Sequence, residues 1–324
     1  MTALYQHVGM THAPRHVGRK WRRVAVVYLI VLALLAFLAP VIAADEPLAV
    51  KQNGRWSVPA LRSLFGRSGP GLETQSTESI LRTVIVGPDS VDLAKRLSPP
   101  NDAHWLGTDD LGRDVLARLI HGTRVSLLVG ITAAVISILV GTFFGALSGY
   151  YGGVLDWMIS RLIELVVCFP FLFLVLAIVT VFEPSTTTVI LALGMTSWTT
   201  SARLVRAEFL RVREMEFTQA ARAIGAGDAR IIVRHLLPNA IAPVVVLGAF
   251  GVGSAILVES ALSFLGLGVA LPAASWGSIL SSADDYLGQA WWLVVFPGIA
   301  IFSTVMACNV IGESTRERRV RSYN

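Results

Sequence analysis

Six apolar stretches, each close to the length that crosses a lipid bilayer, constrain the fold of this chain more than any other feature. An α-helix rises about 1.5 Å per residue, so about 20 apolar residues span a hydrocarbon core of about 30 Å. Backbone groups inside lipid must be satisfied within the segment, which favours helices. The sequence therefore predicts an all-α polytopic membrane protein with six transmembrane helices, at 24–44, 125–149, 157–182, 187–206, 241–266 and 291–311.

The composition supports a lipid environment. Charged residues make up only 15% of the 324 residues, whereas soluble domains contain about 25%. Basic residues precede the stretch 24–44 and small residues end it, so a cleaved secretory signal is the alternative there. Because secretory signals have apolar cores of only about 7–15 residues, we interpret 24–44 as a retained helix.

The positions of the basic residues predict the orientation. They cluster at 15–23, 203–234 and 316–321, whereas the short segments 183–186 and 267–290 contain none. Basic loops stay on the cytoplasmic side, so this asymmetry places both termini in the cytoplasm. It also explains the net charge of +5, so no nucleic-acid partner is expected. The predicted cytoplasmic parts are the tails 1–23 and 313–324 and the connecting segment 207–240.

The long segment 45–124 is predicted to lie on the opposite, extracytoplasmic side. Its first part, 45–80, is rich in Gly, Pro, Ser and charge and has no sustained period, which indicates a loosely ordered loop. Apolar residues then recur at helical spacing from Leu111 to Ile120, with charged residues on the other face. This pattern predicts an amphipathic helix at about 110–121 that lies against the membrane or the helix bundle.

Three glycines follow one another at four-residue spacing in the second apolar stretch, at Gly141, Gly145 and Gly149. In an apolar helix this spacing lets a neighbouring backbone approach closely. Close packing within the bundle and a subunit interface both use such residues. We favour packing within the bundle.

The connecting segment 207–240 carries the most distinctive pattern. A basic continuation of the preceding span leads to about two turns of helix at 216–224, which Gly225 and Gly227 can close because glycine tolerates left-handed backbone. Pro238 fits the first turn of the next helix. Small side chains within the short helix let the surface of another protein approach its backbone. The sequence therefore favours a docking helix, and the alternative is an interfacial helix that only links two spans.

No pattern indicates an enzyme. A P-loop requires a Gly-Lys-Ser/Thr run to hold phosphates, and none of Lys20, Lys51 and Lys95 follows a glycine. The runs His-Glu-x-x-His, Gly-x-Ser-x-Gly and Cys-x-x-Cys are absent as well. The chain is predicted to have no catalytic residues and no cofactor or metal of its own.

Two carboxylates fall within predicted spans, Glu259 beside Ser260 and Glu164. An ionisable group in the membrane is costly unless it is paired or faces water, so each is a candidate for the transport pathway. The alternative is a hydrogen-bonded residue that holds helices in register. We favour that structural role for Glu259.

Five separated motifs, in a fixed order over about residues 92–313, resemble one family. Gln219-Ala220-Ala221-x-x-x-Gly225, followed by His235-Leu236-Leu237-Pro238, is similar to the Glu-Ala-Ala loop of ABC importer permeases. The resemblance is closest to the permease subunits of dipeptide, oligopeptide and nickel importers. The other motifs are His104–Asp109 with Leu111–Asp114, Gly149–Gly153, Leu257–Gly268 and Ser275–Gly277.

The resemblance implies a type I ABC importer permease fold over residues 124–312, in a bacterial inner membrane. The chain would form half of the translocation pathway for di- or oligopeptides, and nickel chelates, glutathione-like compounds or oligosaccharides are the alternative substrates. Implied partners are a second related permease, two cytosolic ATPase subunits that carry ATP and Mg, an extracytoplasmic substrate-binding protein and the lipid membrane.

The resemblance also implies roles for particular residues. A coupling helix at 216–227 would dock on an ATPase subunit through Glu216, Gln219, Ala220, Ala221, Arg222, Ile224, Gly225, Ala226, Leu237 and Pro238. The outer segment would receive the substrate-binding protein, with Asp109, Arg113, Asp114 and Trp276 as candidate docking residues.

Two functions of other classes remain as alternatives. An ion-driven secondary transporter would use Glu259 and Glu164, but such folds show inverted repeats and broken spans, and neither is visible in this sequence. A structural or sensory membrane protein would leave the ordered motifs unexplained.

Overall fold

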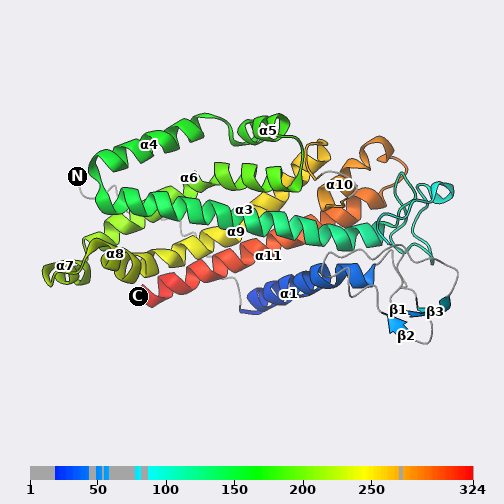
Figure 1. Cartoon of the computed structure of the whole chain (residues 1–324), viewed down its shortest axis with the longest axis horizontal. Helices are drawn as coiled ribbons and strands as arrows, with labels where there is room; N and C mark the ends of the chain where they lie inside the picture. Colours follow the sequence, from blue (N-terminus) through cyan, green and yellow to red (C-terminus); the bar gives the residue numbers. More distant parts are fainter. Residues whose placement is uncertain are drawn as a thin grey trace, which may run out of the picture.

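The computed structural model describes residues 19–43, 49–52, 55–57, 77–81, 87–269 and 273–323. Its long helices lie roughly along one axis and form an elongated bundle (Figure 1). This confirms the helical polytopic class. The long elements are α1 (Arg19–Ile42), α3 (Val115–Tyr151), α4 (Gly153–Cys168), α5 (Phe171–Val181), α6 (Thr186–Arg213), α9 (Leu237–Phe264) and α11 (Trp292–Tyr323).

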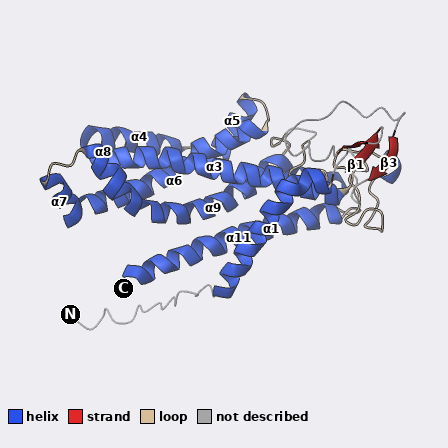
Figure 2. Ribbon diagram, turned by 60° about the horizontal axis from the view of Figure 1, so that its bottom comes forward, coloured by secondary structure: helices blue, strands red, loops and turns tan. Residues whose placement is uncertain are grey.

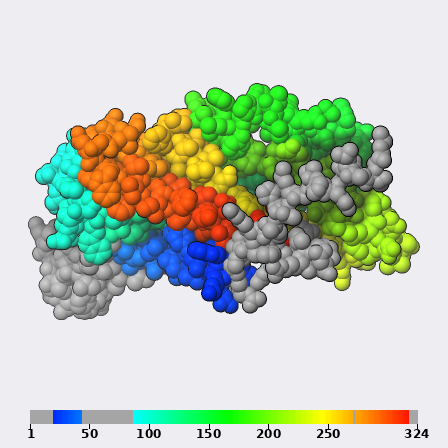
Figure 3. All heavy atoms as spheres, turned by 180° about the vertical axis from the view of Figure 1, so that it is seen from behind, coloured from blue at the N-terminus to red at the C-terminus, as the bar shows by residue number. Residues whose placement is uncertain are grey.

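Short elements close the two ends of the bundle (Figures 1 and 2). One end holds α7 (Glu216–Ala223), α8 (Asp228–Ile231) and the π-helix η3 (Ile232–Leu236). The other end holds β1 (Ala49–Gln52), β2 (Arg55–Ser57), β3 (Thr77–Leu81), η2 (Leu93–Lys95), α10 (Trp276–Ser281) and η4 (Asp284–Tyr286). Figure 3 shows the two ends on the surface, with the α10 region in orange and the α7–α8 region in yellow-green.

Four described helical stretches are long and apolar enough to cross a membrane: Lys20–Ile42, Val115–Tyr151, Asp228–Phe264 and Trp292–Arg316. The number of candidate membrane spans among the described residues rises to five if α4 and α5 together form one span. The predicted span 187–206 forms most of α6, yet it does not reach the same apolar character. Its run Thr196-Ser197-Trp198-Thr199-Thr200-Ser201 is the reason, because hydroxyl side chains lower the hydropathy of the helix.

The predicted continuous helix at 157–182 is wrong. α4 and α5 meet at a bend of 84°. Phe169 between them is extended, with φ −85° and ψ 134°. Pro170 explains the break, since a proline disfavours helical backbone at the preceding residue and removes a hydrogen-bond donor.

The glycine row of α3 packs against α6. A Cβ atom on Gly141 would lie 2.4 Å from Ser201 Cβ, and one on Gly145 would lie 2.5 Å from the carbonyl oxygen of Ala202. A Cβ on Gly149 would lie 2.6 Å from Phe209 Cβ. The two backbones therefore approach closely along the length of the contact, which confirms packing within the bundle.

The segment 45–124, which we call the outer segment after its predicted side, differs from expectation in two respects. Residues 45–80 were predicted as a loosely ordered loop, but among their described residues β1 pairs antiparallel with both β2 and β3 in the order β2-β1-β3. Residues 45–48, 53–54 and 58–76 of that prediction lie outside the described residues. The amphipathic helix predicted at 110–121 is not a separate element, because α3 starts at Val115 and continues to Tyr151. Asp114 caps it by accepting a hydrogen bond from the Ala117 N–H at 2.9 Å, which fixes the helix start one turn later than predicted.

Candidate functional site

The short helix α7 lies beyond the ends of the long helices (Figure 1). It starts after Met215, which is extended, and it ends before Gly225, whose φ is +83°. Only glycine adopts this backbone without strain, so the predicted helix end is confirmed at Gly225. Gly227 has an ordinary φ of −70° and precedes α8. Pro238 lies in the first turn of α9, as predicted.

One face of α7 packs on the chain itself. The Thr218 hydroxyl donates a hydrogen bond to the carbonyl oxygen of Val212 at 2.9 Å, and Ala221 is buried. The expectation that Ala221 faces another protein is therefore wrong, because α7 needs an inner face. The exposed residues of the predicted set are Glu216, Gln219, Ala220, Arg222, Ile224, Gly225 and Pro238, and the half-buried ones are Ala226 and Leu237.

Tyr150, at the end of α3, joins α3 to the α7–α8 segment. Its hydroxyl donates to Asp228 Oδ1 at 2.6 Å, and the Arg222 guanidinium lies 5.7 Å from the centre of its ring. Its carbonyl oxygen accepts a hydrogen bond from Arg213 Nη1 at 3.1 Å. These contacts join the α7–α8 segment to α3, and α3 to the end of α6. Sequence reasoning quoted Tyr150 only within a motif and gave it no role.

Asp156 joins three helices close to the same end. Arg206 of α6 donates to it through Nε at 2.5 Å and through Nη2 at 2.7 Å. The Ser148 hydroxyl of α3 also donates to Asp156, which lies in the first turn of α4. A two-point arginine–carboxylate pair fixes orientation as well as distance. The α7 end of the bundle is therefore tied together by directional contacts.

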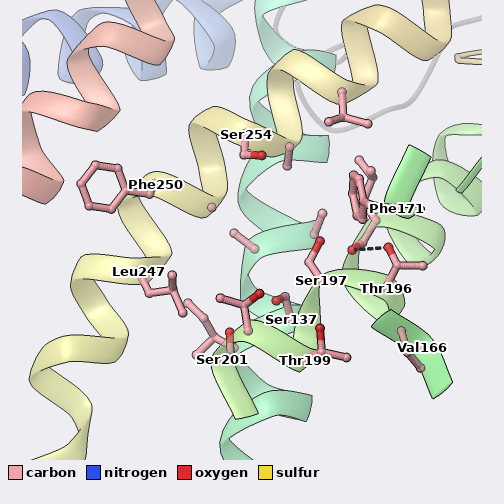
Figure 4. Close-up of a pocket in the computed structure, with 18 of the residues that line it drawn as sticks. Ser137, Val166, Phe171, Thr196, Ser197, Thr199, Ser201, Leu247, Phe250 and Ser254 are labelled. Atoms are coloured by element: carbon pink, nitrogen blue, oxygen red, sulfur yellow. Dashed lines mark hydrogen bonds between the residues drawn. The ribbon is translucent and has the colours of Figure 1, made fainter. Parts of the chain in front are cut away.

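A cavity of about 510 Å³ lies deeper in the bundle, among α3, the α4–α5 bend, α6 and α9. Its walls combine apolar side chains, such as Phe171, Leu247 and Phe250, with many hydroxyl groups (Figure 4). Sequence reasoning missed this cavity. The signal for it was the hydroxyl-rich run within a predicted span. The polar lining residues are Ser137, Thr196, Ser197, Thr199, Thr200, Ser201, Arg203 and Ser254.

Glu259 lies outside the described cavity lining and is fully buried. The Ser263 hydroxyl donates to its Oε1 at 2.7 Å, and the hydroxyls of Ser126 and Ser260 lie 3.4 Å from its Oε2. The Ser126 hydroxyl oxygen in turn accepts a hydrogen bond from the backbone N–H of Trp276 at 3.3 Å. The carboxylate therefore connects α3, α9 and α10, an arrangement that suits a register residue.

Glu164 has a different environment. Its Oε2 lies 2.5 Å from Arg161 Nη1, and both side chains are more than half exposed. No described contact joins Glu164 to Glu259, so the structure does not bring the two predicted pathway carboxylates together.

We expect Glu259→Gln to keep transport within about twofold of wild type, because an amide still offers an oxygen acceptor to the serines. Glu259→Leu should destabilise the protein by about 1–3 kcal/mol for each hydroxyl left without a partner. Thermal unfolding of the detergent-solubilised protein measures the second effect. Loss of transport in a stably folded Glu259→Gln protein would instead indicate that transport needs the ionised form of Glu259 or its exchange of a proton.

The four predicted docking residues of the outer segment are not exposed. Asp109, Arg113, Asp114 and Trp276 are 1%, 6%, 4% and 0% exposed. Arg113 Nε lies 2.7 Å and Arg118 Nε 3.5 Å from Asp109 Oδ2. These residues hold the outer segment in shape and cannot touch a docked protein directly, which corrects the expectation of direct contact.

Further contacts attach the outer segment to the bundle. His104 Nδ1 lies 2.8 Å from Asp114 Oδ2. The indole N–H of Trp292 donates to the carbonyl oxygen of Thr108 at 3.0 Å, and that of Trp276 to the carbonyl oxygen of Leu119 at 3.2 Å. The fold thus defines a helical integral membrane protein with an internal cavity. At one end of its bundle the outer segment is attached by hydrogen bonds, and at the other end lies the short helix α7.

Comparison with known proteins gives the family. Residues 141–318 match the model described as "Binding-protein-dependent transport system inner membrane component", and the chain belongs to this family. The dipeptide transport system permease protein DppC of Alkalihalophilus pseudofirmus is 41% identical over 224 residues, which cover 69% of this chain and 74% of that protein. DppC of Haemophilus influenzae is 34% identical over 294 residues, covering 91% and 88%. The resemblance to ABC importer permeases is confirmed.

A solved structure agrees with the fold. An inward-facing form of the MetNI methionine ABC transporter has a TM-score of 0.51 and 19% identity, covering 64% of this chain and 97% of that chain. At this identity the likeness shows the fold alone.

Proposed function

We propose that this chain is one of two related permease subunits in an ATP-driven importer that receives short peptides from an extracytoplasmic binding protein. The dipeptide permeases among its relatives support the substrate class. ATP and Mg would be bound by two cytosolic ATPase subunits, since this sequence has no P-loop. The protein would lie in the inner membrane with α7 and both termini in the cytoplasm, the side that the basic residues favour.

The observation that carries the proposal is the attachment of α7. Its outer face is exposed, with Ile224 87% exposed. Tyr150 contacts Asp228 and Arg222 and so joins the α7–α8 segment to α3, and Thr218 joins α7 to Val212 of α6. An exposed face that is rigidly joined to several helices suits a part that transmits movement from a partner. An interfacial helix that only linked α6 to α9 would not require these contacts.

The cavity supports the pathway role. Hydroxyl groups from α3, α6 and α9 offer donors and acceptors to the amide groups of a peptide, and apolar residues beside them accept varied side chains. A second permease would complete the pathway on the side that this chain leaves open.

The test is the recovery of partners from gently solubilised membranes, with subunits identified by mass spectrometry. Ile224→Asp places a charge on the exposed face of α7 without disturbing the core. It should lower recovery of ATPase subunits at least about tenfold, because an unpaired charge in an interface is costly. The second permease should remain bound, since α7 lies apart from the long helices.

Leu93→Asp is the matched control. Like Ile224, Leu93 has an exposed branched aliphatic side chain, 65% exposed, but it lies at the outer end of the bundle. It should leave ATPase recovery unchanged. Equal recovery in both variants would contradict the role of α7, and a wild-type chain recovered with no ATPase would contradict the importer itself.

The ion-driven alternative gains no support from the geometry. It needs Glu164 and Glu259 as a joint ion site, whereas one is paired on an exposed helix face and the other is enclosed by serines. The bend between α4 and α5 is a broken span of the kind that secondary transporters use, but the family assignment accounts for it without an ion site.

A further inference from the structure

Arg203 differs from every other described residue that lines the cavity, because it alone carries a charge. Its side chain is exposed. Within the part of the chain that the structure describes, no hydrogen bond or ion pair holds its guanidinium. Arg206, one turn further along α6, is held at two points by Asp156. The two arginines therefore have different roles, and only Arg203 is available to a ligand.

Arg203 continues the hydroxyl-rich face of α6. Thr196, Thr200 and Arg203 are separated by four and three residues, the spacing that places side chains on one helix face. Since α6 runs towards α7, Arg203 lies about one turn beyond the hydroxyls on the α7 side of the cavity. Ser137 of α3 and Ser254 of α9 also line the cavity (Figure 4).

A cavity with neutral walls and a single cation selects for an anionic group. A carboxylate that enters an uncharged, partly apolar space loses water and is costly without a partner. A guanidinium compensates for this loss best, since its N–H groups match the two oxygens of a carboxylate. Because Arg203 is exposed, the bond is weak enough to break, as passage through a pathway requires.

We propose that Arg203 binds the C-terminal carboxylate of the transported peptide at the exit side of the cavity, and so makes the permease itself selective for free peptide acids. This inference rests on the proposed peptide transport. The competing role for Arg203 is attachment to lipid phosphates at the membrane surface, which arginines near helix ends also perform. That role gives no preference between peptides.

The experiment uses the complete transporter in proteoliposomes with ATP inside and binding protein outside. Two labelled alanine tripeptides are compared, one ending in a carboxylate and one in a carboxamide, each at a concentration that saturates the binding protein. Wild type should import the acid about tenfold faster than the amide, the factor expected for one charged hydrogen-bonded contact. Arg203→Gln should bring the rate for the acid down to that for the amide.

Two further variants separate charge from folding. Arg203→Lys should keep most of the preference, because it keeps the cation. Arg124→Gln, which removes an exposed arginine of α3 outside the described cavity lining and at the end of the bundle opposite α7, should leave both rates unchanged. ATP hydrolysis stimulated by loaded binding protein should be normal in Arg203→Gln, which shows that assembly and coupling are intact.

The outcomes are distinguishable. Equal wild-type rates for the two peptides, or a preference that persists in Arg203→Gln, overturn the inference while peptide transport stands. An equal fall for both peptides in Arg203→Gln overturns it as well and favours the lipid attachment. Import of neither peptide by wild type overturns the proposed function, and the inference with it.

Discussion

Gly145→Val is expected to prevent α3 and α6 from packing and to abolish recovery of folded protein. A Cβ at this position would lie 2.5 Å from the carbonyl oxygen of Ala202 and 2.8 Å from Val205 Cβ. The first of these atoms is backbone, so no rotamer change relieves the clash and a whole helix must shift. Overpacking typically costs about 1–3 kcal/mol, and more where backbone must move. The recovered fraction of monodisperse protein in detergent and its unfolding temperature measure the loss.

Gly298→Val is the matched control. Gly298 also lies within a long helix, α11, but a Cβ there would meet no atom within 4 Å. It should behave as wild type. Similar losses in the two variants would mean that valine in a membrane helix is harmful in itself, and the close α3–α6 approach would not be the cause.

Asp109→Asn is expected to loosen the outer segment. The amide keeps an oxygen for the N–H groups of Leu111 and Arg113, both 2.9 Å from Asp109 Oδ1. It removes the negative charge of Asp109, the described carboxylate that forms an ion pair with Arg118. The nitrogens of Arg118 have no hydrogen-bond partner within the described residues. Breaking a buried ion pair on one side costs about 3–5 kcal/mol. Limited proteolysis should therefore cut between residues 87 and 114 at least about tenfold faster.

Asp102→Asn makes the same chemical change at an exposed residue of the same segment. It should leave the proteolysis rate unchanged. If proteolysis cut Asp109→Asn no faster than wild type, the buried charges would not be what holds the outer segment in place. Its hydrogen bonds to the bundle, such as the one from Trp292 to Thr108, would then be what holds it.

The sequence was most informative where one physical effect dominates. Apolar length alone predicted α1, α3, α9 and α11, because lipid leaves the backbone no alternative to a helix. Glycine stereochemistry likewise predicted the end of α7 at Gly225. The motifs predicted the family, and the comparisons confirmed it.

Sequence reasoning was wrong where tertiary contacts decide. Arg113 and Asp114 belong to the predicted charged face of the helix, yet both are buried, where Arg113 pairs with Asp109 and Asp114 contacts His104. Pairing between distant charges cannot be read from periodicity. The cavity was missed for a similar reason, since its walls come from four separate parts of the chain. The bend at Pro170 could have been predicted from the sequence, because a proline inside a predicted helix tends to kink or break it.

The bend at Pro170 also constrains how the protein is made. α5 has 11 residues and is therefore only about 16 Å long, roughly half of what crosses the hydrocarbon core. A ribosome-bound chain that released α4 and α5 into lipid one after the other would expose the backbone groups at the bend to hydrocarbon, at a cost of several kcal/mol each. Insertion of this pair is thus expected to wait until α6 has been synthesised, so that the three helices leave the translocon together.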